Sequence, residues 1–145
     1  FTVRSADKPK IFMAAGTGIA PIRSQINSLL NQGSQADLSL FWGLRKKDDL
    51  YLFEEFKELT LKYPNFHLVI CLDQENSFLG LDVDLFKRGR IDKAFSDFVK
   101  ENRLKEDRLN EFEYYLCSGR EIVEALKGFL EGLGVKKENI FFDKF

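Results

Sequence analysis

The sequence predicts an α/β fold, a three-layer αβα sandwich built around a five-stranded parallel sheet. Short apolar runs of strand length alternate along the chain with amphipathic segments of helical period. The runs are nearly continuous rather than alternating with polar residues, as in strands that are covered on both faces. This strand–helix order favours parallel strands joined by right-handed crossovers, with helices on both faces of the sheet.

Two strand–helix pairs are expected in the first part of the chain. The first strand, residues 11–15, leads through a glycine turn into a helix, and Pro21 suits the first position of that helix because its missing N–H costs nothing there. The second strand, residues 38–43, precedes a helix that Asp48-Asp49 can cap and that Tyr63-Pro64 ends.

The rest of the chain continues the alternation after one break. Residues 73–90 have no clear period and contain two glycines, so a long irregular connection is expected there. The charged stretch over residues 100–113 is expected to be a solvated face. The regular elements of this part are expected to be a strand over 66–72, a helix over 91–99, a strand over 114–117, a helix over 119–133 and a strand over 139–142.

The composition indicates one globular domain of 145 residues with 44% hydrophobic and 31% charged residues. A formal net charge of −1 favours neither nucleic acid nor an anionic membrane as a partner. No apolar run approaches the roughly 20 residues of a membrane span, so no membrane contact is expected from this segment. Two cysteines in apolar runs argue against a disulfide scaffold and favour a cytoplasmic location. One histidine and no Cys-x-x-Cys predict no metal site.

The glycine turn after the first strand is the strongest candidate for a binding site. Gly16 and Gly18 allow a sharp turn and a close approach of the backbone, with Thr17 between them. Free N–H groups at the start of the helix, around Ile19, favour an anion such as a phosphate. Pro21 stands where the dinucleotide fingerprint has its third glycine, and the Gly-Lys-Ser/Thr of a nucleotide-triphosphatase loop is absent. An ordinary strand-to-helix turn is the alternative.

The full string Gly-Thr-Gly-Ile-Ala-Pro over residues 16–21 resembles the nicotinamide-dinucleotide lobe of the ferredoxin–NADP⁺ reductase superfamily, which has a Rossmann-like fold. Similar segments follow in the family's order, and together they span nearly the whole chain. They are Phe41-Trp42-Gly43-Leu44-Arg45, Cys117-Ser118-Gly119-Arg120-Glu121-Ile122 and Ile140-Phe141-Phe142-Asp143-Lys144-Phe145. The resemblance implies that residues 9–145 bind the dinucleotide. Residues 1–8 are then a linker from a flavin-binding domain outside this segment.

The resemblance also implies which residues bind the cofactor. The turn from Gly16 to Gly18 would receive the pyrophosphate. Cys117 would lie beside the nicotinamide ring as the catalytic candidate, next to Ser118, Gly119 and Ile122, although Ser-Gly replaces the family's usual Gly-Pro. A buried cysteine at a strand end is the alternative for Cys117. Phe145 is the candidate for an aromatic side chain that stacks on the flavin.

Asp73 follows the third strand, where the family distinguishes its two dinucleotides. Its carboxylate can accept hydrogen bonds from both ribose hydroxyls of NADH and would repel a 2′-phosphate. The next residue is Gln74, and no arginine is adjacent in the sequence to compensate. NADH rather than NADPH is therefore the expected cofactor. Arg45 is a candidate for a phosphate contact, and a solvated loop residue is the alternative for both side chains.

These expectations predict the NAD(P)H-binding lobe of a flavin-dependent oxidoreductase. Electrons would pass from NADH to FAD or FMN in a flavin-binding domain of the same polypeptide, and then to an acceptor that the sequence does not identify. Without its flavin domain the chain is expected to bind dinucleotide weakly and to be inactive. Two alternatives stay open. One is a non-catalytic nucleotide-sensing or partner-docking module, and the other is a flavodoxin-like domain that binds a mononucleotide.

Overall fold

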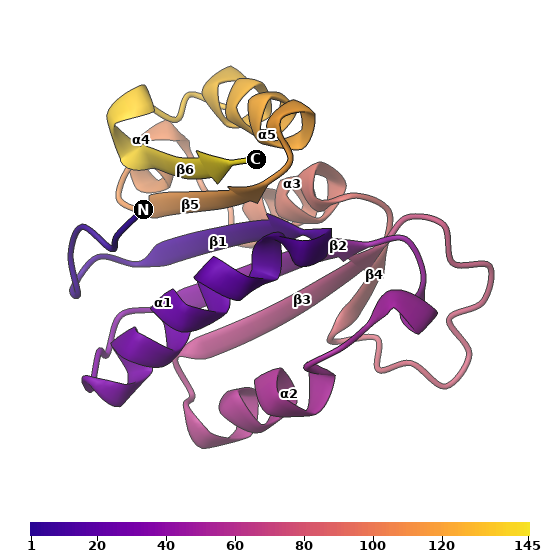
Figure 1. Ribbon diagram of the computed structural model, residues 1–145. Helices are drawn as coiled ribbons and strands as arrows, with labels where there is room; N and C mark the ends of the chain where they lie inside the picture. Colours follow the sequence, from indigo (N-terminus) through magenta and orange to yellow (C-terminus); the bar gives the residue numbers. More distant parts are fainter.

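Six parallel strands form one sheet in the order β4-β3-β2-β1-β5-β6 in the computed structural model, which describes residues 1–145 (Figure 1). The chain steps outward from β1 to β4 and then returns to the other side of β1 as β5. The direction of strand order therefore reverses between β1 and β5, where ligands of such sheets bind outside the carboxyl ends. The strands are β1 Lys10–Ala15, β2 Leu38–Leu44, β3 Phe66–Leu72, β4 Phe86–Arg88, β5 Glu113–Ser118 and β6 Ile140–Lys144.

Helices cover both faces of the sheet, which confirms the three-layer prediction (Figure 1). Helices α1 and α2 pack on one face, while α3, α4 and α5 pack on the other. The α-helices are α1 Ile19–Asn31, α2 Phe53–Lys62, α3 Ile91–Glu101, α4 Glu106–Leu109 and α5 Arg120–Gly132. Three short 3₁₀ helices, η1 Gly16–Gly18, η2 Lys47–Asp49 and η3 Lys137–Asn139, precede α1, α2 and β6.

The sheet divides the hydrophobic core into two clusters. In β1, Phe12 and Ala14 pack toward α1, whereas Ile11 and Met13 pack toward α5 and α3. All four side chains are fully buried because successive residues of a strand point to opposite faces. This two-sided burial explains why the strands read as continuous apolar runs. None of the helices combines the length and the apolar character needed to cross a membrane.

The expectation of five strands is wrong, because β4 adds a sixth strand within the predicted irregular connection. It pairs with β3 from Ile70↔Phe86 to Leu72↔Arg88. Only Phe86 of this three-residue strand is buried, while Lys87 and Arg88 are exposed. A short, charged edge strand lacks the apolar run that marks the inner strands, so periodicity cannot reveal it.

Two predicted helix starts are also wrong. Helix α1 begins at Ile19, after a 3₁₀ turn over the glycines, so Pro21 is its third residue rather than its first. The missing N–H of proline is still tolerated because first-turn N–H groups have no partner within the helix. Helix α2 begins only at Phe53. The two aspartates, Asp48 and Asp49, belong to η2 instead, and Leu52 precedes α2 with a φ of 58°.

The N-terminal segment lies against the amino end of the sheet. The Phe1 ring packs edge-on against the Tyr115 ring, and the Arg4 N–H donates to the Tyr115 hydroxyl at 2.9 Å. That hydroxyl donates to Glu113, whose carboxylate pairs with the ammonium of Lys10 at 3.2 Å. The linker role of residues 1–8 stays a prediction, and these contacts attach the segment to β1 and β5.

Candidate functional site

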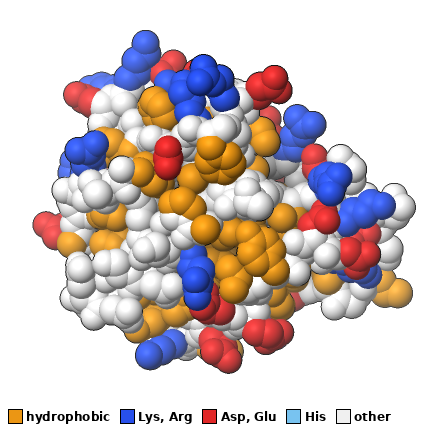
Figure 2. Space-filling view, viewed as in Figure 1, with side chains coloured by type: hydrophobic (Ala, Val, Ile, Leu, Met, Phe, Trp, Pro, Cys, Tyr) orange, Lys and Arg blue, Asp and Glu red, His pale blue; other side chains and the backbone are white.

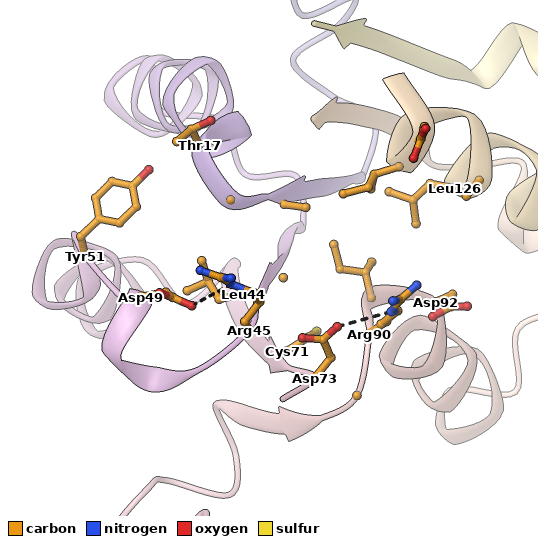
Figure 3. A pocket seen from close by; sticks show the side chains of 18 residues that line it. Thr17, Leu44, Arg45, Asp49, Tyr51, Cys71, Asp73, Arg90, Asp92 and Leu126 are labelled. Atoms are coloured by element: carbon orange, nitrogen blue, oxygen red, sulfur yellow. Dashed lines mark ion pairs between the residues drawn. The ribbon is translucent and has the colours of Figure 1, made fainter. Parts of the chain in front are cut away.

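The main cavity, about 680 Å³ in volume, opens at the carboxyl edge of the sheet. This volume is typical of a small-molecule site. Strands β1, β2 and β3 end at the cavity, and the first turns of α3 and α5 complete its wall (Figure 3). Of the residues predicted for the site, Gly16, Thr17, Arg45, Asp73 and Ile122 line it. Residues from four parts of the chain therefore line one cavity.

The two glycines of the β1 turn have different structural roles. Gly16 has a φ of +56°, and a Cβ built on it would meet nothing within 4 Å, so its backbone faces open space. A Cβ on Gly18 would lie 2.0 Å from the carbonyl oxygen of Cys117. Gly18 therefore permits η1 to pack on the end of β5, while Gly16 provides the left-handed turn beside the cavity. Trp42 holds this turn in place by donating its indole N–H to the Gly16 carbonyl at 3.3 Å.

Two exposed ion pairs stand at the cavity (Figure 3). The Nε of Arg45 lies 3.5 Å from an oxygen of Asp49, and the Nε of Arg90 lies 3.4 Å from an oxygen of Asp73. The backbone N–H of Asp73 donates to the Leu44 carbonyl, which fixes the end of β3 against β2. Each arginine thus has a carboxylate partner in this structure, and each carries further N–H donors for a ligand.

Except for Ile122, which lines the cavity, the nicotinamide-side candidates form a separate group at the end of β5. Cys117 is fully buried among residues of the α1-facing core, and burial together with the charge of Asp143 raises the pKa of its thiol to about 11. The Phe145 N–H donates to the Ser118 carbonyl, and the Arg120 N–H donates to the Phe145 carbonyl. The Phe145 ring is exposed. None of the residues in this group lines the cavity.

The remaining predicted residues support the turn from behind. Gly18 and Ile19 are buried and Pro21 is half-buried, all outside the cavity lining. Gly119 precedes α5, close to the Phe145 carbonyl. The structure therefore brings Gly16, Thr17, Arg45 and Asp73, but not Gly18, into one cavity together with Ile122. It places Cys117 and Ser118 next to the same turn, across the β1–β5 boundary.

Sequence reasoning missed several polar or aromatic residues that line the cavity. Tyr51 packs edge-on against Trp42, and Asp92 and Glu121 lie in the first turns of α3 and α5. Arg90 and Asp49 are the partners in the two ion pairs. The sequence held one signal for these residues, the glycine at position 89 just before the predicted helix. In the structure Gly89 has a φ of +109° and forms the turn before α3. No three His, Cys, Asp or Glu side chains gather closely enough to hold a metal ion.

The fold and the cavity define a nucleotide-binding domain of the Rossmann-like class, with its glycine turn at the reversal of strand order. The order places β1 between β2 and β5, which differs from the flavodoxin-like order, where β1 lies between β2 and β3. The flavodoxin-like alternative is therefore wrong. The chain belongs to the oxidoreductase NAD-binding domain family, whose model matches residues 12–127.

Relatives support this assignment over the full length of the chain. The chain is 30% identical over 146 residues to the xylene/toluene monooxygenase electron transfer component XylA of Pseudomonas putida and covers 39% of that protein. It is 28% identical over 152 residues to one component of the Na⁺-translocating NADH-quinone reductase of Actinobacillus succinogenes and covers 34% of that component. The chain thus spans between a third and two fifths of these relatives.

Solved structures show the same fold. The chain superposes on Amycolatopsis cytochrome P450 reductase GcoB with a TM-score of 0.82 and 22% identity, covering 98% of this chain and 39% of that one. The predicted resemblance to the ferredoxin reductase type of NAD-binding domain is confirmed. A non-catalytic sensing or docking module is not favoured, because the relatives are named as electron transfer components and reductases.

Proposed function

We propose that this chain is the NADH-binding lobe of a flavin-dependent oxidoreductase whose flavin-binding domain lies in the same polypeptide. The cavity that joins the β1 turn to Asp73 at the end of β3 carries the proposal. A dinucleotide has two phosphates and an adenosine ribose to hold, and this cavity offers a group suited to each. The names of the relatives, an electron transfer component and a component of an NADH-quinone reductase, agree with this class.

The pyrophosphate is assigned to the turn over Gly16 and Thr17. Gly16 faces open space there, so a phosphate can approach its backbone closely. Arg45 supplies a positive charge from the end of β2, provided that its guanidinium shares its donors between Asp49 and the ligand. Asp73 is assigned to the adenosine ribose, because an ionised carboxylate accepts hydrogen bonds from both hydroxyls.

The nicotinamide is assigned to the end of β5, beside the same turn. When bound, the nicotinamide supplies a hydride to the flavin, which is the chemistry of the cofactors rather than of the protein. With a pKa of about 11, the Cys117 thiol stays protonated near neutral pH and presents a small, polarisable surface rather than a nucleophile. Ser118, Gly119 and Ile122 would surround this surface, and the exposed Phe145 ring would face the flavin.

The wider setting follows from the same proposal. FAD or FMN would be bound outside this segment, in the flavin-binding domain that receives the hydride and passes electrons to an acceptor. The two cysteines are free and buried, which supports a reducing, cytoplasmic setting.

An NADH titration of the ¹⁵N-labelled chain tests the proposal. Amide shifts should concentrate at Gly16, Thr17, Arg45 and Asp73 and in the segment after β5. The variant Asp73→Ala should weaken NADH binding about tenfold, the size expected for lost hydrogen bonds to a charged group.

The matched control for this titration is Asp37→Ala, which removes an exposed carboxylate at the amino end of the sheet. It should leave NADH binding unchanged. Shifts that avoid both the β1 turn and the segment after β5 would sink the proposal.

A further inference from the structure

Glu75 joins the two loops that follow β2 and β3, although it does not itself line the cavity. The main-chain hydrogen bonds between these strands end just beyond them, where the Gln74 N–H donates to the Arg45 carbonyl at 2.8 Å. One residue further along, the Glu75 side chain continues the connection, since its Oε1 accepts the Lys47 N–H at 2.9 Å. The first residue of η2 is therefore held by a carboxylate that lies 28 residues away in the sequence.

The position and the charge of Glu75 are themselves fixed. Its carbonyl accepts a hydrogen bond from the Arg88 guanidinium of β4 at 2.9 Å, and that guanidinium lies 4.5 Å from the centre of the Phe78 ring. Its Oε2 accepts the Asn76 N–H at 3.1 Å. The hydrogen bond from the Lys47 N–H is the main cause that lowers the pKa of the Glu75 carboxyl below its ordinary value. An ionised acceptor forms stronger hydrogen bonds than a neutral one, so this contact is suited to hold a loop in place.

The short turn η2 connects this contact to the cavity (Figure 3). Because η2 is only three residues long, an attachment at its first N–H also restrains its last residue, Asp49. One oxygen of the Asp49 carboxylate accepts the Lys46 N–H at 3.2 Å and lies 3.5 Å from the Nε of Arg45. The Arg45 side chain lines the cavity and is 71% exposed, so little packing fixes its direction. The direction of the guanidinium therefore depends on Asp49, and through it on η2.

We propose that Glu75 is a positioning residue for dinucleotide binding, which holds η2 and Asp49 so that the Arg45 guanidinium faces the pyrophosphate. This inference rests on the proposed function, in which Arg45 supplies positive charge to the phosphates. Without the Glu75 carboxylate, η2 loses its attachment to the loop after β3, and the guanidinium spends more of its time in solvent. The ribose candidate Asp73 is held separately, because its own N–H donates to the Leu44 carbonyl. The loss should therefore affect the phosphates of a ligand and not its adenosine.

Titrations of the ¹⁵N-labelled chain with ADP and with adenosine test the inference, because the two ligands differ only in the phosphates. Glu75→Ala should weaken ADP binding about fivefold, the size expected for one lost hydrogen bond, and change adenosine binding less than about twofold. Glu75→Gln should keep most of the ADP affinity, because its amide oxygen still accepts the Lys47 N–H. In an Arg45→Ala background, Glu75→Ala should have no further effect on ADP, since a positioning residue acts only through the group that it positions.

The matched control is Asp82→Ala, which removes another carboxylate of the same loop that accepts a main-chain N–H, that of Asp84 at 2.9 Å. This contact stays within the loop, so ADP binding should not change. Unchanged ADP binding in Glu75→Ala would overturn the inference, as would an equal loss for adenosine or an undiminished loss in the Arg45→Ala background. If the unaltered chain bound neither ADP nor NADH, the proposed function would fail as well, which separates the two outcomes.

Discussion

The two ends of the parallel sheet both carry ion pairs, but the pairs differ in burial. At the amino end, the Lys10 ammonium and the Glu113 carboxylate are 3.2 Å apart with 0% and 6% of their side chains exposed. The Tyr115 and Ser5 hydroxyls also donate to that carboxylate. At the carboxyl end, by contrast, the two arginines of the cavity are largely exposed and meet their partners at 3.4 and 3.5 Å.

This difference assigns different roles to similar chemical groups. Burial lowers the pKa of Lys10, although the Glu113 charge opposes that shift. A buried pair of this kind must stay together, because either charge alone would remain unsolvated. Exposed pairs contribute little to stability, so their members can exchange partners with a ligand. The amino end therefore holds the N-terminal segment in place, while the carboxyl end keeps its charges available for a ligand. Figure 2 shows one face of the molecule, on which apolar side chains gather near the middle and most charged side chains lie toward the edge.

Breaking the buried pair should have the largest effect on stability. Lys10→Met leaves the Glu113 carboxylate buried without its cation, so the free energy of unfolding should fall by about 3–5 kcal/mol. Urea unfolding followed by circular dichroism measures this loss.

Two further variants sharpen the comparison between the ends. Arg45→Met at the carboxyl end should change the free energy of unfolding by less than about 1 kcal/mol. Lys10→Met combined with Glu113→Gln should recover much of the loss, since no charge is left buried and Tyr115 keeps an acceptor. A cost at Arg45 as large as that at Lys10 would show that the two ends do not differ.

The β1 turn is the rigid part of the carboxyl end. Gly18→Ala should lower the free energy of unfolding by about 3 kcal/mol, because its Cβ would overlap the Cys117 carbonyl and force the backbone apart. Gly16→Ala meets no neighbour and should cost only about 1 kcal/mol, from its left-handed conformation. Thermal unfolding of both variants checks the order, and a larger cost at Gly16 would contradict the division of roles.

Alkaline pH should produce a gradual loss of stability. Burial raises the pKa of Cys71 to about 12 and that of Cys117 to about 11, above the ordinary thiol value of 9.0. Above pH 9 the unfolded chain releases these protons while the folded chain keeps them. The unfolded state then binds fewer protons, so the free energy of unfolding falls by up to about 1.4 kcal/mol per pH unit for each thiol.

Other groups and one variant refine the alkaline test. Burial raises the pKa of Tyr114 and Tyr115 in the same sense, whereas the lowered pKa of Lys10 opposes the trend. Urea unfolding at several pH values between 8 and 10.5 measures the slope. Cys71→Ala should make the slope shallower, and a slope that this variant does not alter would exclude Cys71 as a contributor.

Much of the fold could be predicted because its signals are local. The β1 run and the helix after it are recognisable from neighbouring residues alone, since burial on both faces makes a strand continuously apolar. The charged edge strand over Phe86–Arg88 has no such signal, because only its pairing with β3 makes it a strand. The start of α2 was misplaced for a related reason, since Asp48 and Asp49 fit a helix cap but lie in η2.

In the site, too, some features could be predicted from neighbouring residues and others depend on the packing of distant segments. The sequence by itself determined the Rossmann-like layers, the glycine turn and the polar residues that follow the strands, because each depends on residues close together in the chain. Only the tertiary structure decided that Gly18 packs on Cys117, and that Arg90 stands beside Asp73. Both contacts join distant segments, and their existence depends on how the strands and helices pack.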